Sequence, residues 1–156
     1  MPPPAAYVAE LPWQIARPET VVITCVDGRW YRHFQEFARV HLDAGPCTDF
    51  MAVPGGIEPL TLADEIPKDF NFFRRRLDAL VGAHGTRRIV VIAHEECAWY
   101  RVRMGAVSAD ALRARQIADV RRAASWLRER FDGVIVQPYF ARLSGTTPEK
   151  VIFEGV

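Results

Sequence analysis

The sequence predicts an α/β protein with a central, mostly parallel sheet of about four strands, flanking helices and a short strand at one edge. Two observations lead to this prediction. Residues 20–25 and 88–93 are short apolar runs rich in β-branched residues, which is typical of strands buried on both faces of a parallel sheet. Longer amphipathic segments separate the runs, and this alternation favours right-handed crossovers between parallel strands.

The N-terminal half begins with an arm at residues 1–18, which its prolines predict to be extended. The first strand is expected at Thr20–Cys25. Arg29–Leu42 carries apolar side chains at helical spacing and is predicted to be a helix. Asp49–Val53 is predicted to be a short strand. It leads into Pro54-Gly55-Gly56, a loop whose glycines allow another segment to approach the backbone closely.

The C-terminal half continues the same alternation of helices and strands. The predicted elements are a helix at Asp69–Ala83, a strand at Arg88–Ala93, a helix at Ser108–Phe131, a strand at Gly133–Gln137 and an edge strand at Val151–Phe153. Trp99–Gly105 is predicted to be a polar and aromatic connection. Pro138 is expected to close the strand that precedes it.

Length and composition indicate a single domain, which we expect to span residues 19–156 after the arm. The formal net charge of +1 provides no field that would attract nucleic acid or an anionic membrane. No apolar run approaches the roughly 18 residues of a membrane span. The three cysteines are an odd number and a poor disulfide framework, so we expect a reducing cytoplasm and free thiols.

Residues suited to metal binding follow two of the predicted strands. Cys25, Asp27 and Arg29 are spaced by two where the first strand ends, and His94 and Cys97 follow the third. Ligands of open α/β sheets bind beyond the carboxyl ends of the strands. Zinc takes thiolate and imidazole ligands, and catalytic zinc keeps three protein ligands and one open position. We therefore predict a zinc site made by Cys25, His94 and Cys97.

Asp27 has two roles open to it. It could fill the fourth zinc position and shut the site, or it could pair with Arg29 and accept a hydrogen bond from a metal-bound water. Taken singly, a buried cysteine usually only packs, and a histidine after a strand is usually a structural group. The joint occurrence of C-x-D-x-R and H-x-x-C at two strand ends favours a metal site. No role is assigned to the other cysteine and histidines: Cys47, His33, His41 and His84.

A thiol enzyme with Cys25 as nucleophile is a third interpretation. A phosphatase-like or rhodanese-like loop would cradle an anion with its backbone amides and would need an arginine six residues after the cysteine. That position is Tyr31, and the nearest arginines are Arg29 and Arg32. The signature of such an enzyme is therefore missing.

The two motifs, CVDGR at Cys25–Arg29 and HEEC at His94–Cys97, resemble the paired motifs of β-class carbonic anhydrases in order and separation. The resemblance covers residues from about Thr20 to the C-terminus. It implies that Cys25, His94 and Cys97 bind zinc and that Asp27 and Arg29 form a catalytic dyad. It also implies a zinc lyase in which zinc-bound hydroxide converts carbon dioxide to bicarbonate, with Asp27 orienting the nucleophile.

The chain departs from the usual pattern of that family at three places. Gly28 replaces a serine, Ala98 replaces a glycine, and Val53-Pro54-Gly55-Gly56 stands where Arg-Asn-Ala-Gly is common. Relatives on this scaffold hydrolyse carbonyl sulfide or carbon disulfide, so another small linear substrate is one alternative. A non-catalytic zinc protein, with Asp27 closing the site, is the other.

The expected partners are a small-molecule substrate and further copies of the chain, with no nucleic acid and no membrane. The resemblance and the aromatic residues of the arm, Tyr7 and Trp13, favour a homodimer or a larger homo-oligomer. The sequence does not identify the group that carries the proton away from the site.

Overall fold

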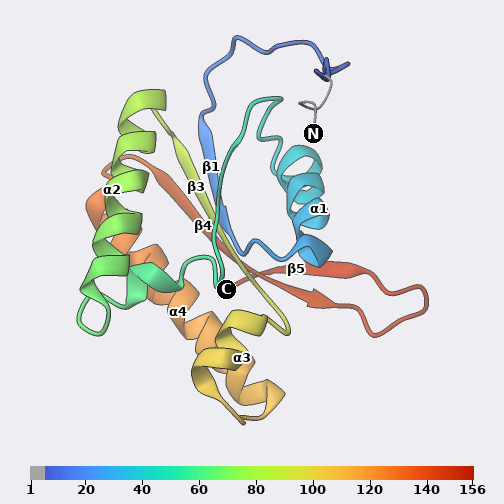
Figure 1. Ribbon diagram of the computed structural model, residues 1–156, viewed down its shortest axis with the longest axis vertical. Coiled ribbons are helices and arrows are strands. Elements are labelled where there is room, and N and C mark those ends of the chain that lie inside the picture. Colours follow the sequence, from blue (N-terminus) through green and yellow to red (C-terminus); the bar gives the residue numbers. More distant parts are fainter. Residues whose placement is uncertain (1–5) are drawn as a thin grey trace, which may run out of the picture.

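The computed structural model describes residues 6–156, which form one five-stranded sheet with helices on both faces (Figure 1). The strands are β1 (Thr20–Thr24), β2 (Asp49–Ala52), β3 (Arg88–His94), β4 (Ile135–Leu143) and β5 (Val151–Gly155). Their spatial order is β2-β1-β3-β4-β5. The first four strands are parallel, and β5 pairs antiparallel with β4 at the edge. The predicted α/β fold, with a mostly parallel sheet and a short edge strand, is confirmed.

The helices lie on both sides of this sheet. They are α1 (Gly28–Glu36), the π-helical segment η1 (Phe37–His41), the 3₁₀ helix η2 (Glu58–Thr61), α2 (Pro67–His84), α3 (Ala98–Met104) and α4 (Ala109–Arg130). Figure 1 shows α2 and α4 on one side of the sheet and α1 on the other. The short helix α3 lies beyond the lower end of the strands in that view.

Strand β1 is buried along its whole length because both of its faces are covered. Val21 and Ile23 point to one face and pack in the same core as Phe73 of α2. Val22 points to the other face and packs in the same core as Phe34 of α1. Alternate side chains of a strand point to opposite faces, so a strand with two covered faces is apolar at every position. This is why the run could be predicted from the sequence.

The register of the sheet brings the ends of β1 and β3 to one edge. Thr24, the last residue of β1, pairs with Ile92 of β3 on one side and with Ala52 of β2 on the other. Cys25 follows Thr24 directly, and His94 lies two residues beyond Ile92. Both side chains therefore start from neighbouring strands at the same edge of the sheet.

The predicted end of the fourth strand is wrong, because β4 continues through Pro138 to Leu143. The Pro138 carbonyl accepts a hydrogen bond from Val156 N at 3.2 Å, on the β5 side of the strand. The amide position of a strand residue points to the same side as its carbonyl. The missing N–H of Pro138 is thus directed where β5 has already ended, and no bond to β3 is lost.

Two helical predictions also differ from the structure. The predicted helix Arg29–Leu42 is α1 followed by η1, where the amide of Leu42 bonds to the carbonyl of Phe37 at 3.1 Å. The predicted connection Trp99–Gly105 is mostly the helix α3, which buries only Tyr100. A helix of seven residues with one buried side chain gives little periodic signal in the sequence.

The described part of the arm, residues 6–18, contains neither helix nor strand. Tyr7 is 85% exposed and Trp13 is 90% exposed. The prediction of an extended arm also covers residues 1–5, which lie outside the described residues. Within residues 6–156, no helix combines the length and the apolar character needed to cross a membrane.

Candidate metal centre

Three side chains meet where β1 and β3 end: Cys25 directly after β1, His94 at the last position of β3, and Cys97 at the N-cap of α3. Their donor atoms all lie within 4.8 Å of one another, and the two sulfurs are 3.9 Å apart. Two sulfurs about 2.3 Å from one ion at a tetrahedral angle would be separated by about 3.8 Å. The pair therefore has the spacing that tetrahedral zinc requires.

The imidazole of His94 is fixed by neighbours that leave one nitrogen free. Its Nδ1 lies 2.8 Å from the backbone carbonyl of Glu95, which can only accept, so Nδ1 carries the proton. The Nε2 atom is buried and has no hydrogen-bond partner. A buried nitrogen without a partner is unfavourable unless a ligand satisfies it. This tautomer, with the other nitrogen bonded to a carbonyl, is typical of histidines that bind metals.

Gln116 of α4 binds the backbone at the end of β3. Its Nε2 donates a hydrogen bond of 2.7 Å to the carbonyl of His94. The ring of Trp30 packs against the imidazole, with the centroids 4.9 Å apart. These contacts fix both the backbone and the ring of His94, so the direction of its free nitrogen is set before any ligand arrives.

The two thiols are buried and interact with each other. The pKa of Cys25 is lowered to about 4, mainly by hydrogen bonding to Cys97, and the backbone N–H groups of Asp27 and Gly55 add to the effect. The pKa of Cys97 is raised by the same pairing and by burial. Two sulfurs this close share one proton, so the site holds a negative charge at neutral pH that a divalent cation would neutralise.

Asp27 and Arg29 form an ion pair next to the three donors. Both carboxylate oxygens of Asp27 accept bonds from the guanidinium, from Nε at 3.0 and 3.2 Å and from Nη2 at 2.6 Å. Oδ1 also accepts a bond from the amide of Arg29 and caps α1. These bonds hold the pKa of Asp27 below its usual value. The group of donors within 4.8 Å comprises Cys25, His94 and Cys97 and does not include Asp27.

The loop Pro54-Gly55-Gly56 packs against the end of β1. Both glycines have positive φ, +77° and +61°. A Cβ atom on Gly56 would lie 3.1 Å from the backbone nitrogen of Cys25, and one on Gly55 would lie 2.3 Å from Cδ1 of Trp99. Side chains at these positions would therefore displace the strand end or the indole.

An apolar hollow of about 350 Å³ opens beside Cys25. Its lining comes from the end of β1, the glycine loop and α3: Cys25, Val26, Asp27, Pro54, Ala98, Trp99 and Val102. Small-molecule sites are typically concave, mostly apolar and fitted with a few polar groups. Asp27 is the charged residue in this lining, so the hollow suits a small apolar molecule that reacts next to a carboxylate.

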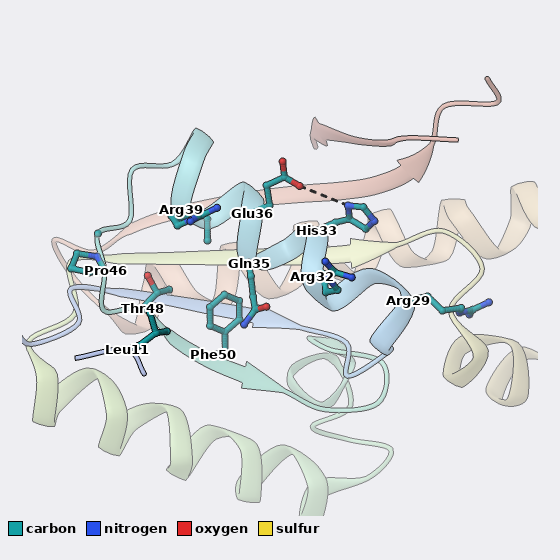
Figure 2. A pocket seen from close by; sticks show the side chains of 12 residues that line it. Leu11, Arg29, Arg32, His33, Gln35, Glu36, Arg39, Pro46, Thr48 and Phe50 are labelled. Carbon is teal, nitrogen blue, oxygen red and sulfur yellow. Dashed lines mark ion pairs between the residues drawn. The ribbon is translucent and has the colours of Figure 1, made fainter. Parts of the chain in front are cut away.

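A larger hollow of about 970 Å³ lies along α1 (Figure 2). Leu11 of the arm, Phe50 of β2 and residues of α1 line it. Figure 2 shows Arg29 at one end, with its side chain pointing away from the others. Because Cys25, His94 and Cys97 do not line it, its size does not make it the reaction site.

Sequence reasoning identified the three donors and the ion pair but missed the residues that support them. Gln116, Glu58 and Trp99 each contact a segment far away in the chain, and each lies outside the two motifs. The one signal in the sequence was Gln116, a polar residue among the core positions of a long helix.

The fold of the chain is similar to that of several solved structures. The chain is similar to the β-carbonic anhydrase CafA of Aspergillus fumigatus, with a TM-score of 0.59 and 13% identity over 90% of this chain and 76% of that one. Tetrameric β-carbonic anhydrases of Sordaria macrospora give 0.56 and 15%, over 90% and 83%. The isoform TvaCA1 of Trichomonas vaginalis gives 0.52 and 15%, over 96% and 90%.

No curated protein matches the chain. A sequence model of the family described as "Putative carbonic anhydrase" matches residues 17–147, which include both motifs and all three donors. The resemblance inferred from the motifs is thereby confirmed, and the chain belongs to this carbonic anhydrase family.

Proposed function

We propose that this chain is a zinc-dependent carbonic anhydrase that interconverts carbon dioxide and bicarbonate. One observation carries the proposal: two thiols and a buried, unpartnered imidazole nitrogen lie within 4.8 Å of one another at the sheet edge. Zinc fits this donor set, because two sulfurs and one nitrogen leave the fourth position open, as catalytic zinc requires.

In this proposal, the three donors hold the metal and the ion pair prepares the reaction. Bound zinc supplies Lewis-acid chemistry that lowers the pKa of water to about 7 and so provides a nucleophile at neutral pH. With the metal bound, the carboxylate of Asp27 would accept a hydrogen bond from the nucleophile and orient it towards the carbon of carbon dioxide. Arg29 keeps Asp27 ionised, because an adjacent cation favours the charged form. The apolar hollow holds the substrate and excludes competing polar molecules.

The pairing of Asp27 with Arg29 favours a zinc site whose fourth position is open over one in which Asp27 occupies that position. Both oxygens of the carboxylate already accept hydrogen bonds from the guanidinium. Moving Asp27 onto the metal would require these bonds to break. A shut, non-catalytic zinc protein is therefore the less favoured alternative.

Hydrolysis of carbonyl sulfide or carbon disulfide is a second candidate function. The observation that favours it is the apolar lining of the hollow, to which the loop contributes Pro54 and no polar side chain. Both sulfur compounds are small, linear and of low polarity, and so resemble carbon dioxide in shape. Release of hydrogen sulfide from either compound at a higher kcat/KM than carbon dioxide hydration would favour this candidate.

The test is stopped-flow carbon dioxide hydration by zinc-loaded protein between pH 7 and pH 9. We expect hydration at pH 7 that disappears when a chelator removes the zinc and returns when zinc is added back. Activity that appears only towards pH 9 would indicate that Asp27 closes the site. Zinc-loaded protein without hydration at any of these pH values would contradict the proposal.

We also propose a homo-oligomer of chains that each fold as one domain at residues 19–156. Support comes from the arm, whose apolar side chains Tyr7, Leu11 and Trp13 are 85–90% exposed in the single chain. The Sordaria macrospora relatives are described as tetrameric. Sedimentation velocity should give a dimer or larger for the full chain and a smaller species without residues 1–18. A cytoplasmic location would keep the thiols reduced for metal binding.

A further inference from the structure

We propose that Trp99 is a specificity-determining residue that sets the width of the apolar hollow, and that Glu58 and Arg103 are positioning residues that hold its indole. The identity of the substrate rests on the proposed function. The steric role of Trp99 does not, because it concerns which molecules can reach Cys25 whether or not the chain hydrates carbon dioxide.

Trp99 lies at the junction of two walls of the hollow. It is the second residue of α3, two positions after Cys97, and it is 38% exposed. The indole lies directly against the backbone of Gly55 on the facing loop, where a Cβ atom would be 2.3 Å from Cδ1. The ring therefore spans from α3 to the loop beside Cys25, and its removal would open that side of the hollow.

A buried carboxylate fixes the indole in this position. Glu58 of η2 is only 4% exposed, and its Oε2 accepts a hydrogen bond of 2.5 Å from Nε1 of Trp99. Its Oε1 lies 3.0 Å from Nε of Arg103, one turn further along α3. A buried charge is unfavourable unless it is paired and hydrogen-bonded, so these contacts stabilise one another. They restrict a side chain that would otherwise turn about two bonds.

Arg103 is held in turn by a second acidic residue at the surface. Its Nη2 lies 3.5 Å from Oε2 of Glu65, in the turn that follows η2. The two acidic residues, Glu58 and Glu65, thus tie α3 to the segment around η2. A rigid wall of this kind discriminates by exclusion, because a large molecule can enter only if the network breaks.

The first test uses Cys25 as a probe in metal-free protein. N-ethylmaleimide and N-(1-pyrenyl)maleimide share one chemistry and differ in bulk, and peptide mass spectrometry measures the rate of modification at Cys25. We expect Trp99→Ala to raise the rate of the pyrenyl reagent relative to the ethyl reagent by about tenfold or more, the size of effect that small pocket changes give. An unchanged ratio would overturn the proposal.

Two further variants complete this test. Phe72→Ala is the matched control, because Phe72 is an aromatic residue of α2 that is 61% exposed and lies outside the hollow. The ratio of the two modification rates in this variant should equal that of the wild type. Trp99→Phe keeps a ring but loses the N–H that Glu58 accepts, and should give an intermediate ratio. It also keeps the proposal testable if the alanine variant does not fold.

The role of Glu58 is tested by a double-mutant cycle. Glu58→Ala should raise the same ratio part of the way, because the indole loses its partner. In the Trp99→Ala background, Glu58→Ala should change the ratio no further, since it acts through Trp99. An equal effect in both backgrounds would indicate general loosening of the fold and would contradict the positioning role.

Turnover separates failure of this proposal from failure of the proposed function. In zinc-loaded protein, Trp99→Ala should raise kcat/KM for 4-nitrophenyl acetate, a bulky ester, by about tenfold relative to carbon dioxide hydration. A wild-type protein without hydration would refute the proposed function and leave the maleimide result standing. Hydration in every variant with an unchanged ester preference would refute the role of Trp99 alone.

Discussion

The two strand ends that meet at the metal centre differ in their surroundings. At the end of β3, His94 and Cys97 are each 1% exposed, and Gln116 fixes the backbone of His94. At the end of β1, Cys25 is 6% exposed, and the chain then emerges towards solvent with Asp27 and Arg29. One end is enclosed and the other borders the apolar hollow.

This difference suggests that metal binding and the reaction depend on different residues. The enclosed end contributes two buried ligands, and the two carboxylates between them, Glu95 and Glu96, lie outside the donor cluster. The open end contributes one ligand and the Asp27–Arg29 ion pair, with the Arg29 side chain 66% exposed. We infer that ligand changes at either end abolish zinc binding, whereas changes to the ion pair affect the reaction and leave the metal bound.

The largest effect is expected from Cys25→Ala. It removes one of two sulfurs, and zinc affinity should fall by more than about a hundredfold, since loss of a residue that merely supports a ligand already lowers it about 10–100-fold. Competition with a fluorescent chelator measures this affinity. Cys47→Ala is the control, because Cys47 lies outside the donor cluster, and it should bind zinc like the wild type. Stoichiometric zinc in Cys25→Ala would contradict the ligand assignment.

Asp27→Asn should have the next largest effect. It tests whether the ion pair after β1 acts in the reaction and not in metal binding. The amide cannot act as a charged acceptor, so kcat/KM for hydration should fall by about a hundredfold or more. Zinc content should stay at the wild-type value. Asp64→Asn changes an exposed aspartate elsewhere and should leave both quantities unchanged. Loss of zinc from Asp27→Asn would indicate instead that Asp27 is a ligand.

Gly55→Ala tests whether the open end depends on its glycine loop. Alanine at a left-handed position is strained by about 1–2 kcal/mol, and Gly85→Ala, at φ +66° with no neighbour within 4 Å, should show this strain alone. At Gly55 the contact with Trp99 should add about 1–3 kcal/mol. Urea unfolding measures the free energy of unfolding of both variants. Equal losses of stability in Gly55→Ala and Gly85→Ala would show that the indole of Trp99 moves aside freely.

Arg29→Gln should have the smallest effect, visible as a change in acid stability. The folded pKa of Asp27 lies below its ordinary value of 3.8, so the ion pair stabilises the fold above that pH and ceases to do so as the pH falls through the lowered pKa. The wild type should therefore exceed the variant in stability at neutral pH, and the two should converge below pH 3.8. Arg32→Gln serves as the exposed control on α1. A difference that persists at the lowest pH would contradict this origin.

The features that could be predicted from the sequence are those that a short segment determines. β1 and β3 were recognisable because burial on both faces leaves a continuous apolar run. The ligands were recognisable because Cys25 and His94 follow those runs directly. Parallel pairing then brings their side chains to one edge, which needs no knowledge of the rest of the chain.

The features that could not be predicted depend on contacts between distant segments. Gln116 reaches His94 from α4, and Glu58 reaches Trp99 from η2. A polar residue in a helix gives no sign of which distant group it will meet. Continuation of β4 through Pro138 likewise depends on where β5 ends, which the sequence of β4 itself does not reveal.

X-ray absorption at the zinc edge of the purified protein is the decisive measurement of whether Cys25, His94 and Cys97 bind zinc together. We expect two sulfur ligands at about 2.3 Å, one imidazole nitrogen at about 2.0–2.1 Å and one further light atom around each zinc. The Cys47→Ala variant should give the same spectrum. A shell with one sulfur or none, or protein that retains no zinc after exposure to it, would contradict the account.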